Sequence, residues 1–562
     1  MQSIERTSAV PTDLSRPAEK RAGPDHTHAD RNLCCDRYGL PGLLRCQGLL
    51  TIMRDTSPVI RGRSIIRNTV LNYSGQAYVM LVGILIMPFY LGHLGAEAYG
   101  LIGFFTLLQA WLQLLDAGLP PSLVRAVAHQ QGTPVSEKSL GRLLRSFELI
   151  FLPITMLCGL LVHVASPWIA AQWLNANTLQ PDTLAHCITL MGIVIALRLY
   201  STLYKSAIQG LEQHEWLNAA NVSIATLRYF GGLLLVSQFS RDPQDFFVFQ
   251  LGVGLLEALL FASKARRQMP APRWLTGLDW QLIKPLLPFA ASLSLSAVLW
   301  IVLTQVDKVL LSNLLPLDQY GYFSLVALIA TGIVMLSNPL VQTLLPRLTV
   351  LVAEGRRDDM HTLFLAANRL ACTFLFPLAG VIALYAEPLI IAWTGDHTAA
   401  RWSGPVLGWY ALGSAIMAAS AFQFYLQYAY GRMHLHLWYS VISTLISVPV
   451  MFVAIHYQGV YGAALAWFFL RATSFAIWPV IVHQHLAPGL HRQWLSDILR
   501  ISAMTAAGLA ISAPVFHLIA DESRGSLLLA LAASGLVTLA LVAASHGPLA
   551  SKIYVLFSKP ST

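Results

Sequence analysis

The feature that most constrains this chain is a series of apolar runs of about twenty residues, separated by short polar segments. A helix of that length crosses a hydrocarbon core roughly 30 Å thick. In lipid, a helix also satisfies its own backbone hydrogen bonds. Of the 562 residues, 55% are hydrophobic and 12% are charged, whereas about a quarter of the residues in a soluble domain are charged. The sequence therefore predicts an all-α polytopic membrane protein.

The apolar runs predict fourteen membrane-spanning helices. The first six lie at 67–91, 97–120, 146–166, 184–206, 217–238 and 246–264, and the next six at 287–312, 318–345, 369–387, 404–428, 435–456 and 459–482. A final pair lies at 498–519 and 526–546. Gln458 and Gly459 are the only boundary signal between the eleventh and twelfth runs.

The segment before the first run is polar. Residues 1–64 contain no apolar stretch of the kind found in a secretory signal peptide, and we expect a disordered cytoplasmic tail. Met53 opens a basic lead into the first helix and is a candidate start of translation. The six cysteines follow neither a zinc-site spacing nor a disulfide framework. We therefore expect free thiols, no metal site and no cofactor.

The positive charges indicate the orientation. The net charge of +9 comes from Lys and Arg at helix ends, which is a topology signal and gives no reason to expect a nucleic-acid partner. The loops on one side of the predicted membrane hold most of these residues, whereas those on the other side hold only Arg241, Arg401 and Arg524. Cytoplasmic loops carry the excess, so we expect both termini in the cytoplasm.

The sequence also contains an internal repeat. The segment Leu94 to Gly100 (LGAEAYG) returns as Leu315 to Gly321 (LPLDQYG). At the same offset, Ser166-Pro167 corresponds to Glu387-Pro388, Tyr204 to Tyr425 and Gly210 to Gly431. These pairs occupy equivalent places in the predicted topology. The Tyr-Gly segment is expected to be an architectural turn without a substrate contact.

The repeat predicts the domain organisation. Residues 65–284 form an N-lobe of helices 1–6 and residues 285–485 a C-lobe of helices 7–12, followed by helices 13 and 14 and a cytoplasmic C-terminus in 486–562. Six is an even number, so the two lobes enter the membrane the same way round and form a parallel repeat. Transporters of this kind bind their substrate between the lobes and rock to give alternating access.

Several segments resemble one known family. Residues Asn68 to Tyr73 (NTVLNY), Pro88 to Gly100 (PFYLGHLGAEAYG), Leu115 to Leu119 (LDAGL) and Gln305 to Lys308 (QVDK) are similar to motifs of the bacterial polysaccharide-repeat (Wzx-type) flippases. These flippases belong to the multidrug/oligosaccharidyl-lipid/polysaccharide exporter superfamily. The resemblance covers roughly 65–480, and it implies a V-shaped exporter fold in the bacterial inner membrane.

The resemblance implies a function as well. The substrate would be undecaprenyl-diphosphate-linked oligosaccharide, translocated for export of O-antigen, capsule or exopolysaccharide, with a polysaccharide polymerase or glycosyltransferases as partners. Two other transport functions remain open, a flippase for the lipid-linked peptidoglycan precursor and an ion-coupled small-molecule or multidrug exporter. No acidic residue occurs between Arg67 and Leu94, where cation-coupled multidrug exporters often have a coupling carboxylate, and this disfavours the second.

Three arginines are the main candidate substrate-binding residues. Arg198, Arg228 and Arg471 fall near the middle of predicted spans, where a charge is costly and needs a cavity or a partner. The forked donors of guanidinium suit a diphosphate. The alternative is structural pairing with Glu257, Asp307 or backbone carbonyls. One Glu257 cannot neutralise three cations, which favours at least one arginine in a cavity.

A further pair of charges lies in the seventh predicted helix. Asp307 and Lys308 are neighbours in sequence, and their side chains point about 100° apart on a helix. Lys308 is a candidate cavity cation and Asp307 a candidate charge partner or coupling group. Anchoring of Lys308 in the outer leaflet, with a purely structural Asp307, is the alternative.

Enzymatic functions fit less well. The sequence has no G-x-x-x-x-G-K-[ST] phosphate-binding loop. A membrane glycosyltransferase or polysaccharide polymerase is the rival enzyme class, and it would be expected to carry a large outer loop rich in acids or arginines. The outer loops here are short, so we expect a transporter with no catalytic residues.

Overall fold

The computed structural model describes residues 58–116, 118–131, 137–269, 277–521 and 523–545. The chain divides into two units, Met1–Arg67 and Asn68–Thr562. The described part of the first unit, residues 58–67, is helical. Most of the predicted tail, including Met53, lies outside the described residues. The first helix begins at Pro58, within the segment predicted to be disordered.

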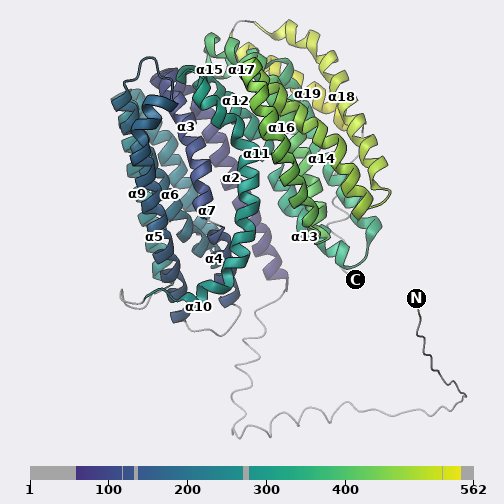
Figure 1. Cartoon of the computed structure of the whole chain (residues 1–562). Helices are drawn as coiled ribbons and strands as arrows, with labels where there is room; N and C mark the ends of the chain where they lie inside the picture. Colours follow the sequence, from purple (N-terminus) through teal and green to yellow (C-terminus); the bar gives the residue numbers. More distant parts are fainter. Residues whose placement is uncertain (1–57, 117, 132–136, 270–276, 522, 546–562) are drawn as a thin grey trace, which may run out of the picture. The chain divides into compact units, whose positions relative to one another are not determined.

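All secondary-structure elements in the described part of the first half of the chain are helices (Figure 1). Its elements are α2 (Pro58–Leu94), α3 (Ala96–Leu112), η1 (Gln113–Asp116), α4 (Leu119–Gln131), α5 (Glu137–Trp168), η2 (Ile169–Trp173), α6 (Pro181–Gly210), α7 (His214–Thr226), η3 (Leu227–Gly231), α8 (Gly232–Leu234), η4 (Leu235–Phe239) and α9 (Pro243–Gln268). We call α2–α9 the first repeat.

The second half consists of helices as well. Its elements are α10 (Trp280–Ile283), η5 (Lys284–Leu286), α11 (Leu287–Leu314), α12 (Leu317–Met335), α13 (Asn338–Ala353), α14 (Arg357–Leu384), α15 (Ala386–Thr394), α16 (His397–Ala429), α17 (His434–Leu486), α18 (Leu490–Ile519) and α19 (Arg524–Ala544). We call α11–α17 the second repeat. The last two helices, yellow in Figure 1, pack against each other and against α14.

The prediction of an all-α polytopic membrane protein is confirmed. Thirteen helices in the described part of the chain are long and apolar enough to cross a membrane. One of them, α17, runs for 53 residues but has non-helical backbone angles at Gly459, with φ 57° and ψ −137°. A residue that carries a side chain rarely adopts a positive φ of this kind, so glycine is required there. The eleventh and twelfth predicted spans are therefore two helices that meet at the predicted boundary.

Two predicted spans end earlier than expected. The predicted span 318–345 is divided, because α12 ends at Met335 and α13 begins at Asn338, next to Pro339. Proline lacks the N–H that continues a helix and restricts the residue before it. The predicted span 97–120 ends at Asp116, before Gly118, whose φ is +66°. The Asp116 carboxylate accepts a hydrogen bond from Gly118 N at 2.9 Å, which terminates the helix.

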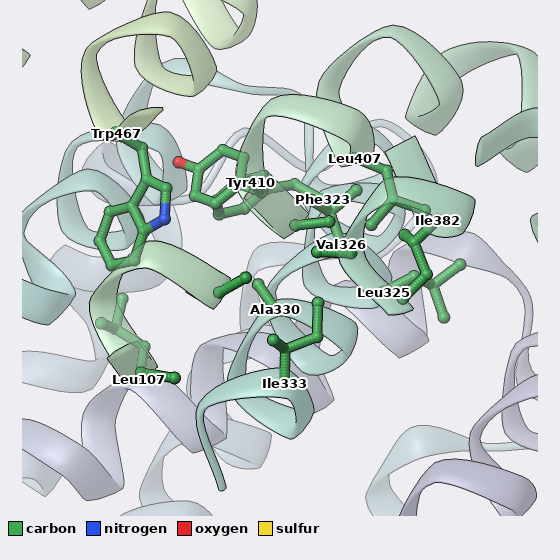
Figure 2. Packing of buried hydrophobic residues seen from close by; sticks show 14 of the residues in the cluster. Leu107, Phe323, Leu325, Val326, Ala330, Ile333, Ile382, Leu407, Tyr410 and Trp467 are labelled. Carbon is green, nitrogen blue, oxygen red and sulfur yellow. The ribbon is translucent and has the colours of Figure 1, made fainter. Parts of the chain in front are cut away.

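The core of the second repeat lies around α12. Phe323 contacts Tyr410 of α16 edge to face, with ring centroids 5.6 Å apart, and Tyr410 stacks on Trp467 of α17 at 5.5 Å. Figure 2 shows these rings in one hydrophobic cluster with Val326 and with Leu107, the latter from α3 of the first repeat. The helix α3 packs directly against α12. The two repeats therefore share one continuous hydrophobic core.

Candidate substrate site

A cluster of charges lies on α6, η3 and α9 of the first repeat. The Glu257 carboxylate is buried, and it accepts hydrogen bonds from Lys205 Nζ at 2.5 Å and from the Arg228 guanidinium. The side chains of Arg228 and Lys205 remain 19% and 30% exposed. We call Lys205, Arg228 and Glu257 the Glu257 cluster. It holds two cations against one carboxylate, so it carries an excess positive charge that can still be reached.

Arg198 lies beside this cluster on α6. It donates a hydrogen bond to Gln109 of α3, and its guanidinium carbon lies 4.8 Å from the centre of the Phe105 ring. It interacts electrostatically with Arg228 and Glu257. Its Nε is buried without a hydrogen-bond partner in the described part of the chain. Arg198 therefore adds a third positive charge to the neighbourhood of one carboxylate.

The backbone around Arg228 is irregular. The fifth predicted span continues through two π-helical turns, η3 and η4, and Arg228 lies in the first of them. A π-turn inserts a residue into a helix, and such turns are frequent at functional sites. Tyr90 of α2 donates a hydrogen bond to the carbonyl of Tyr229 at 2.8 Å, which gives one of the displaced carbonyls a partner.

The second repeat holds the other predicted charges. Asp307 of α11 is fully buried, and its carboxylate accepts a hydrogen bond from the Tyr410 hydroxyl at 2.8 Å. Lys308 Nζ donates to the Thr304 carbonyl at 2.7 Å and lies 3.5 Å from the Asp307 carboxylate. The two neighbours therefore make a long ion pair despite their different directions, and Lys308 contacts its own helix.

Arg471 belongs to the second repeat and not to the Glu257 cluster. Its guanidinium donates to the Leu303 carbonyl at 2.9 Å and lies 4.6 Å from the centre of the Trp467 ring. It also lines a cavity between α11, α16 and α17. The structure thus brings Arg198 and Arg228 together and places Arg471 among other helices. Of the structural pairings considered above, Arg228 pairs with Glu257 and Arg471 with a backbone carbonyl.

Sequence reasoning did not single out Lys205, which lies near the end of the predicted span 184–206. The structure places Lys205 within α6. A signal was available, because Lys205 follows Arg198 by two helical turns, and residues at that spacing share a face of a helix. Gln109, the partner of Arg198, carries no charge and so gave no comparable signal.

A large apolar cavity lies among α2, α12, α14, α15 and α19. Its volume is about 1300 Å³, and its lining is almost entirely aliphatic and aromatic. Leu85 of α2, Phe374 of α14 and Leu536 of α19 are among the lining residues and are more than half exposed. We call it the apolar cavity. It is suited to a hydrocarbon chain and not to a charged headgroup.

The two repeats are joined at the end of the bundle where α3 and α12 begin. Asn175 Nδ2 donates to the Asn313 carbonyl at 2.6 Å, and Asn313 Nδ2 donates to the Trp173 carbonyl at 3.2 Å. The backbone N–H of Leu317 donates to the Asn175 carbonyl at 2.8 Å. We call Asn175 and Asn313 the asparagine latch. It joins the segment after η2 in the first repeat to the last turn of α11 in the second.

The segment that carries the latch is also fixed on its other side. The Glu97 carboxylate of α3 accepts hydrogen bonds from the backbone N–H groups of Asn177, Thr178 and Leu179. A carboxylate that accepts several backbone N–H groups holds a loop in one conformation. The latch segment is therefore held firmly by the first repeat while it contacts the second.

Comparison with known proteins now identifies the family. The family described as "Polysaccharide biosynthesis protein" matches residues 65–352, which is just over half of the chain. The chain belongs to the polysaccharide biosynthesis protein family. Its sequence is 21% identical over 413 residues to that of the Shigella flexneri protein named "Putative O-antigen transporter", and the match spans 72% of this chain and 94% of that protein.

Solved structures confirm the fold of this family member. The structure titled "Lipid II flippase MurJ, inward closed conformation" is similar with a TM-score of 0.61 at 13% identity, over 88% of this chain and 100% of that one. An inward-facing multidrug resistance MATE family transporter of the MOP superfamily gives a TM-score of 0.59 at 14% identity, over 75% and 99% of the two chains. The resemblance stated from the sequence motifs is thus confirmed.

Proposed function

We propose that this member of the polysaccharide biosynthesis protein family is a flippase for undecaprenyl-diphosphate-linked oligosaccharide. It would carry this substrate across the cytoplasmic membrane for export of a surface polysaccharide. The observation that carries the proposal is the combination of an accessible cationic cluster with the 1300 Å³ apolar cavity. A substrate that binds to both the cationic cluster and the apolar cavity has a multiply charged headgroup and a long hydrocarbon chain.

The charges fit a diphosphate. Lys205, Arg228 and Arg198 face the single carboxylate of Glu257. Inside a membrane protein the local dielectric is low, so an excess of positive charge attracts an anion strongly. Guanidinium groups bind phosphate oxygens through paired donors. In this proposal the diphosphate takes over part of the pairing that Glu257 now supplies to Arg228.

The remaining parts of the substrate follow from this placement. The polyprenyl chain would occupy the apolar cavity, and the sugars would lie between the repeats. With the orientation expected from the positive charges, the asparagine latch closes the non-cytoplasmic end. The structure would then be the state that accepts substrate from the cytoplasm. Transport needs no covalent step, so the protein acts as a transporter and not as an enzyme.

A second candidate shares much of this chemistry. The lipid-linked peptidoglycan precursor also has a diphosphate and a polyprenyl chain, and the lipid II flippase structure matches 88% of this chain. We place the oligosaccharide substrate first because the family match and the Shigella relative both concern polysaccharide.

Reconstitution tests the proposal. The full chain is placed in vesicles that carry fluorescent polyprenyl-diphosphate oligosaccharide or fluorescent lipid II, and translocation is followed as loss of fluorescence to an added quencher. Faster movement of the oligosaccharide than in protein-free vesicles is expected. Movement of lipid II alone would assign the second function, and movement of neither would refute both.

A further inference from the structure

The cavity that Arg471 lines differs in chemistry from the apolar cavity. It has a volume of about 370 Å³, and three helices of the second repeat, α11, α16 and α17, form its walls. Its lining combines aromatic rings with the hydroxyl groups of Ser296, Ser420, Ser440 and Ser474. None of the lining residues is acidic. We call it the Arg471 cavity.

Two buried side chains in its wall carry polar atoms that have no hydrogen-bond partner among the described residues. Arg471 is 6% exposed and Gln423 is 1% exposed. Within residues 58–545 as far as the structure describes them, the Nε of Arg471 and both amide atoms of Gln423 have no hydrogen-bond partner. Buried polar groups in native proteins are nearly always paired, because an unpaired one costs free energy. Two such groups on one cavity indicate a polar ligand that can both donate and accept hydrogen bonds.

The aromatic rings narrow the class of ligand. The rings of Tyr439 and Trp478 lie 4.8 Å apart, and those of Phe424 and His436 lie 4.6 Å apart, so the rings form a nearly continuous wall. The face of an aromatic ring carries partial negative charge. It therefore attracts the slightly positive C–H groups that a pyranose ring presents on one face. An aromatic wall together with hydroxyl, amide and guanidinium groups suits a sugar ring.

The positive charge of Arg471 narrows the class of ligand further. Arg471 contacts the Leu303 carbonyl, the Tyr439 side chain and the Trp467 ring, and the described residues place no carboxylate within ion-pair distance of it. Guanidinium stays charged in proteins and binds a carboxylate through two parallel hydrogen bonds. Asp307 interacts electrostatically with Arg471 but also pairs with Lys308. A neutral ligand would therefore leave these two cations with a single carboxylate between them. An anionic group on the ligand would supply a second negative charge.

We propose that the Arg471 cavity binds one sugar ring of the transported oligosaccharide, and that this sugar carries a carboxylate which pairs with Arg471. The proposal rests on the proposed function and adds to it a substrate class, oligosaccharides that contain a uronic acid. It separates two tasks that the sequence assigned to one set of arginines. The Glu257 cluster and Arg198 hold the diphosphate, and Arg471 with Gln423 holds the acidic sugar.

Saturation-transfer NMR on the full chain in nanodiscs tests this division, because the method detects weak binding of free sugars. The probes are glucuronate and galacturonate, each compared with its neutral hexose. Both uronates should receive saturation from the protein, with binding about tenfold or more tighter than that of glucose or galactose, as expected for one charge-assisted contact. Inorganic pyrophosphate should not displace them.

Variants complete the test. Arg471→Gln should abolish the preference for uronate over hexose, and Gln423→Leu should weaken binding of both. Arg471→Lys, which keeps the charge, should retain part of the preference for uronate. It replaces Arg471→Gln as the test variant if Arg471→Gln does not fold. Arg401→Gln is the matched control, since it removes an exposed arginine of α16 that lies outside this cavity and outside the Glu257 cluster, and uronate binding should be unchanged.

Three results would overturn the proposal. They are equal or absent binding of uronate and hexose, unchanged uronate preference in Arg471→Gln, and displacement by pyrophosphate, which would assign Arg471 to the diphosphate. Failure of the flippase function is detected separately, by the transport assay in vesicles. A protein that transports a neutral oligosaccharide but does not bind uronates refutes this inference alone, whereas uronate binding without transport refutes the function.

Discussion

Gly100 and Gly321 occupy the same position in the two repeats, and each faces the backbone of the other's helix. A Cβ atom on Gly100 would lie 2.1 Å from the carbonyl oxygen of Leu317, the first residue of α12. A Cβ atom on Gly321 would lie 2.4 Å from the carbonyl oxygen of Ala96, the first residue of α3. The contact is reciprocal, as expected for two repeats related by a two-fold axis. Only glycine allows these helices to approach so closely.

Alanine at either glycine should therefore destabilise the protein. The added methyl group meets backbone atoms that cannot move aside, so α3 and α12 must separate, at a cost of about 1–3 kcal/mol. Thermal unfolding of Gly100→Ala and Gly321→Ala in detergent measures this. The double variant should cost less than the sum of the two, because one separation relieves both clashes.

Gly252→Ala is the control for these variants. Gly252 lies within α9, and a Cβ atom there would meet nothing within 4 Å. Since alanine favours a helix over glycine by up to about 1 kcal/mol, this variant should be neutral or slightly more stable. Equal losses at Gly100 and Gly252 would contradict the close contact.

The asparagine latch should control access between the repeats. Asn175→Ala and Asn313→Ala each remove a hydrogen bond between them, worth about 0.5–1.5 kcal/mol. Ser324 lies on α12 and faces Gly103 of α3. In a background without other cysteines, Ser324→Cys should react with a water-soluble maleimide several-fold faster in either latch variant than with the latch intact. Asn338→Ala, at an exposed position on α13, should leave the rate unchanged. Unchanged rates in all three variants would show that the latch does not hold this end closed.

Glu257 should be coupled energetically to Arg228. Glu257→Gln leaves two neighbouring cations without their shared carboxylate. We expect a loss of about 1–3 kcal/mol, below the cost for a fully buried pair, because both cations are partly exposed. Adding Arg228→Gln should recover part of the loss. A double-mutant cycle by thermal unfolding measures the coupling, and additive effects would contradict the ion pair.

Most of the architecture could be predicted from the sequence because the membrane imposes a length and a composition on each helix. The boundary at Gly459 was predicted correctly, since Gly459 is the residue whose φ is positive. The breaks before Pro339 and Gly118 were missed. At both places apolar residues resume directly after a short polar break, at Leu340 and at Leu119, and the apolar pattern outweighed the local effect of proline and glycine.

The candidate site was less predictable for a different physical reason. A midspan arginine indicates that a partner or cavity must exist, but the sequence does not state which helix supplies it. Glu257 was named as one alternative partner, and it pairs with Arg228. The place of Arg471 among α11, α16 and α17 depends on how three helices far apart in sequence pack together. The unpartnered Gln423 gave no signal, because glutamine is common in apolar helices that pack closely.

The central claim is that the cations around Glu257 bind the diphosphate of a lipid-linked oligosaccharide. The most direct measurement is the ratio of translocation rates in vesicles for the same oligosaccharide on polyprenyl diphosphate and on polyprenyl monophosphate. The native chain should prefer the diphosphate by about tenfold or more, and Arg228→Gln should bring the ratio close to one at an unchanged level of inserted protein. Equal rates for the two substrates with the native chain, or an undiminished preference in Arg228→Gln, would contradict the claim.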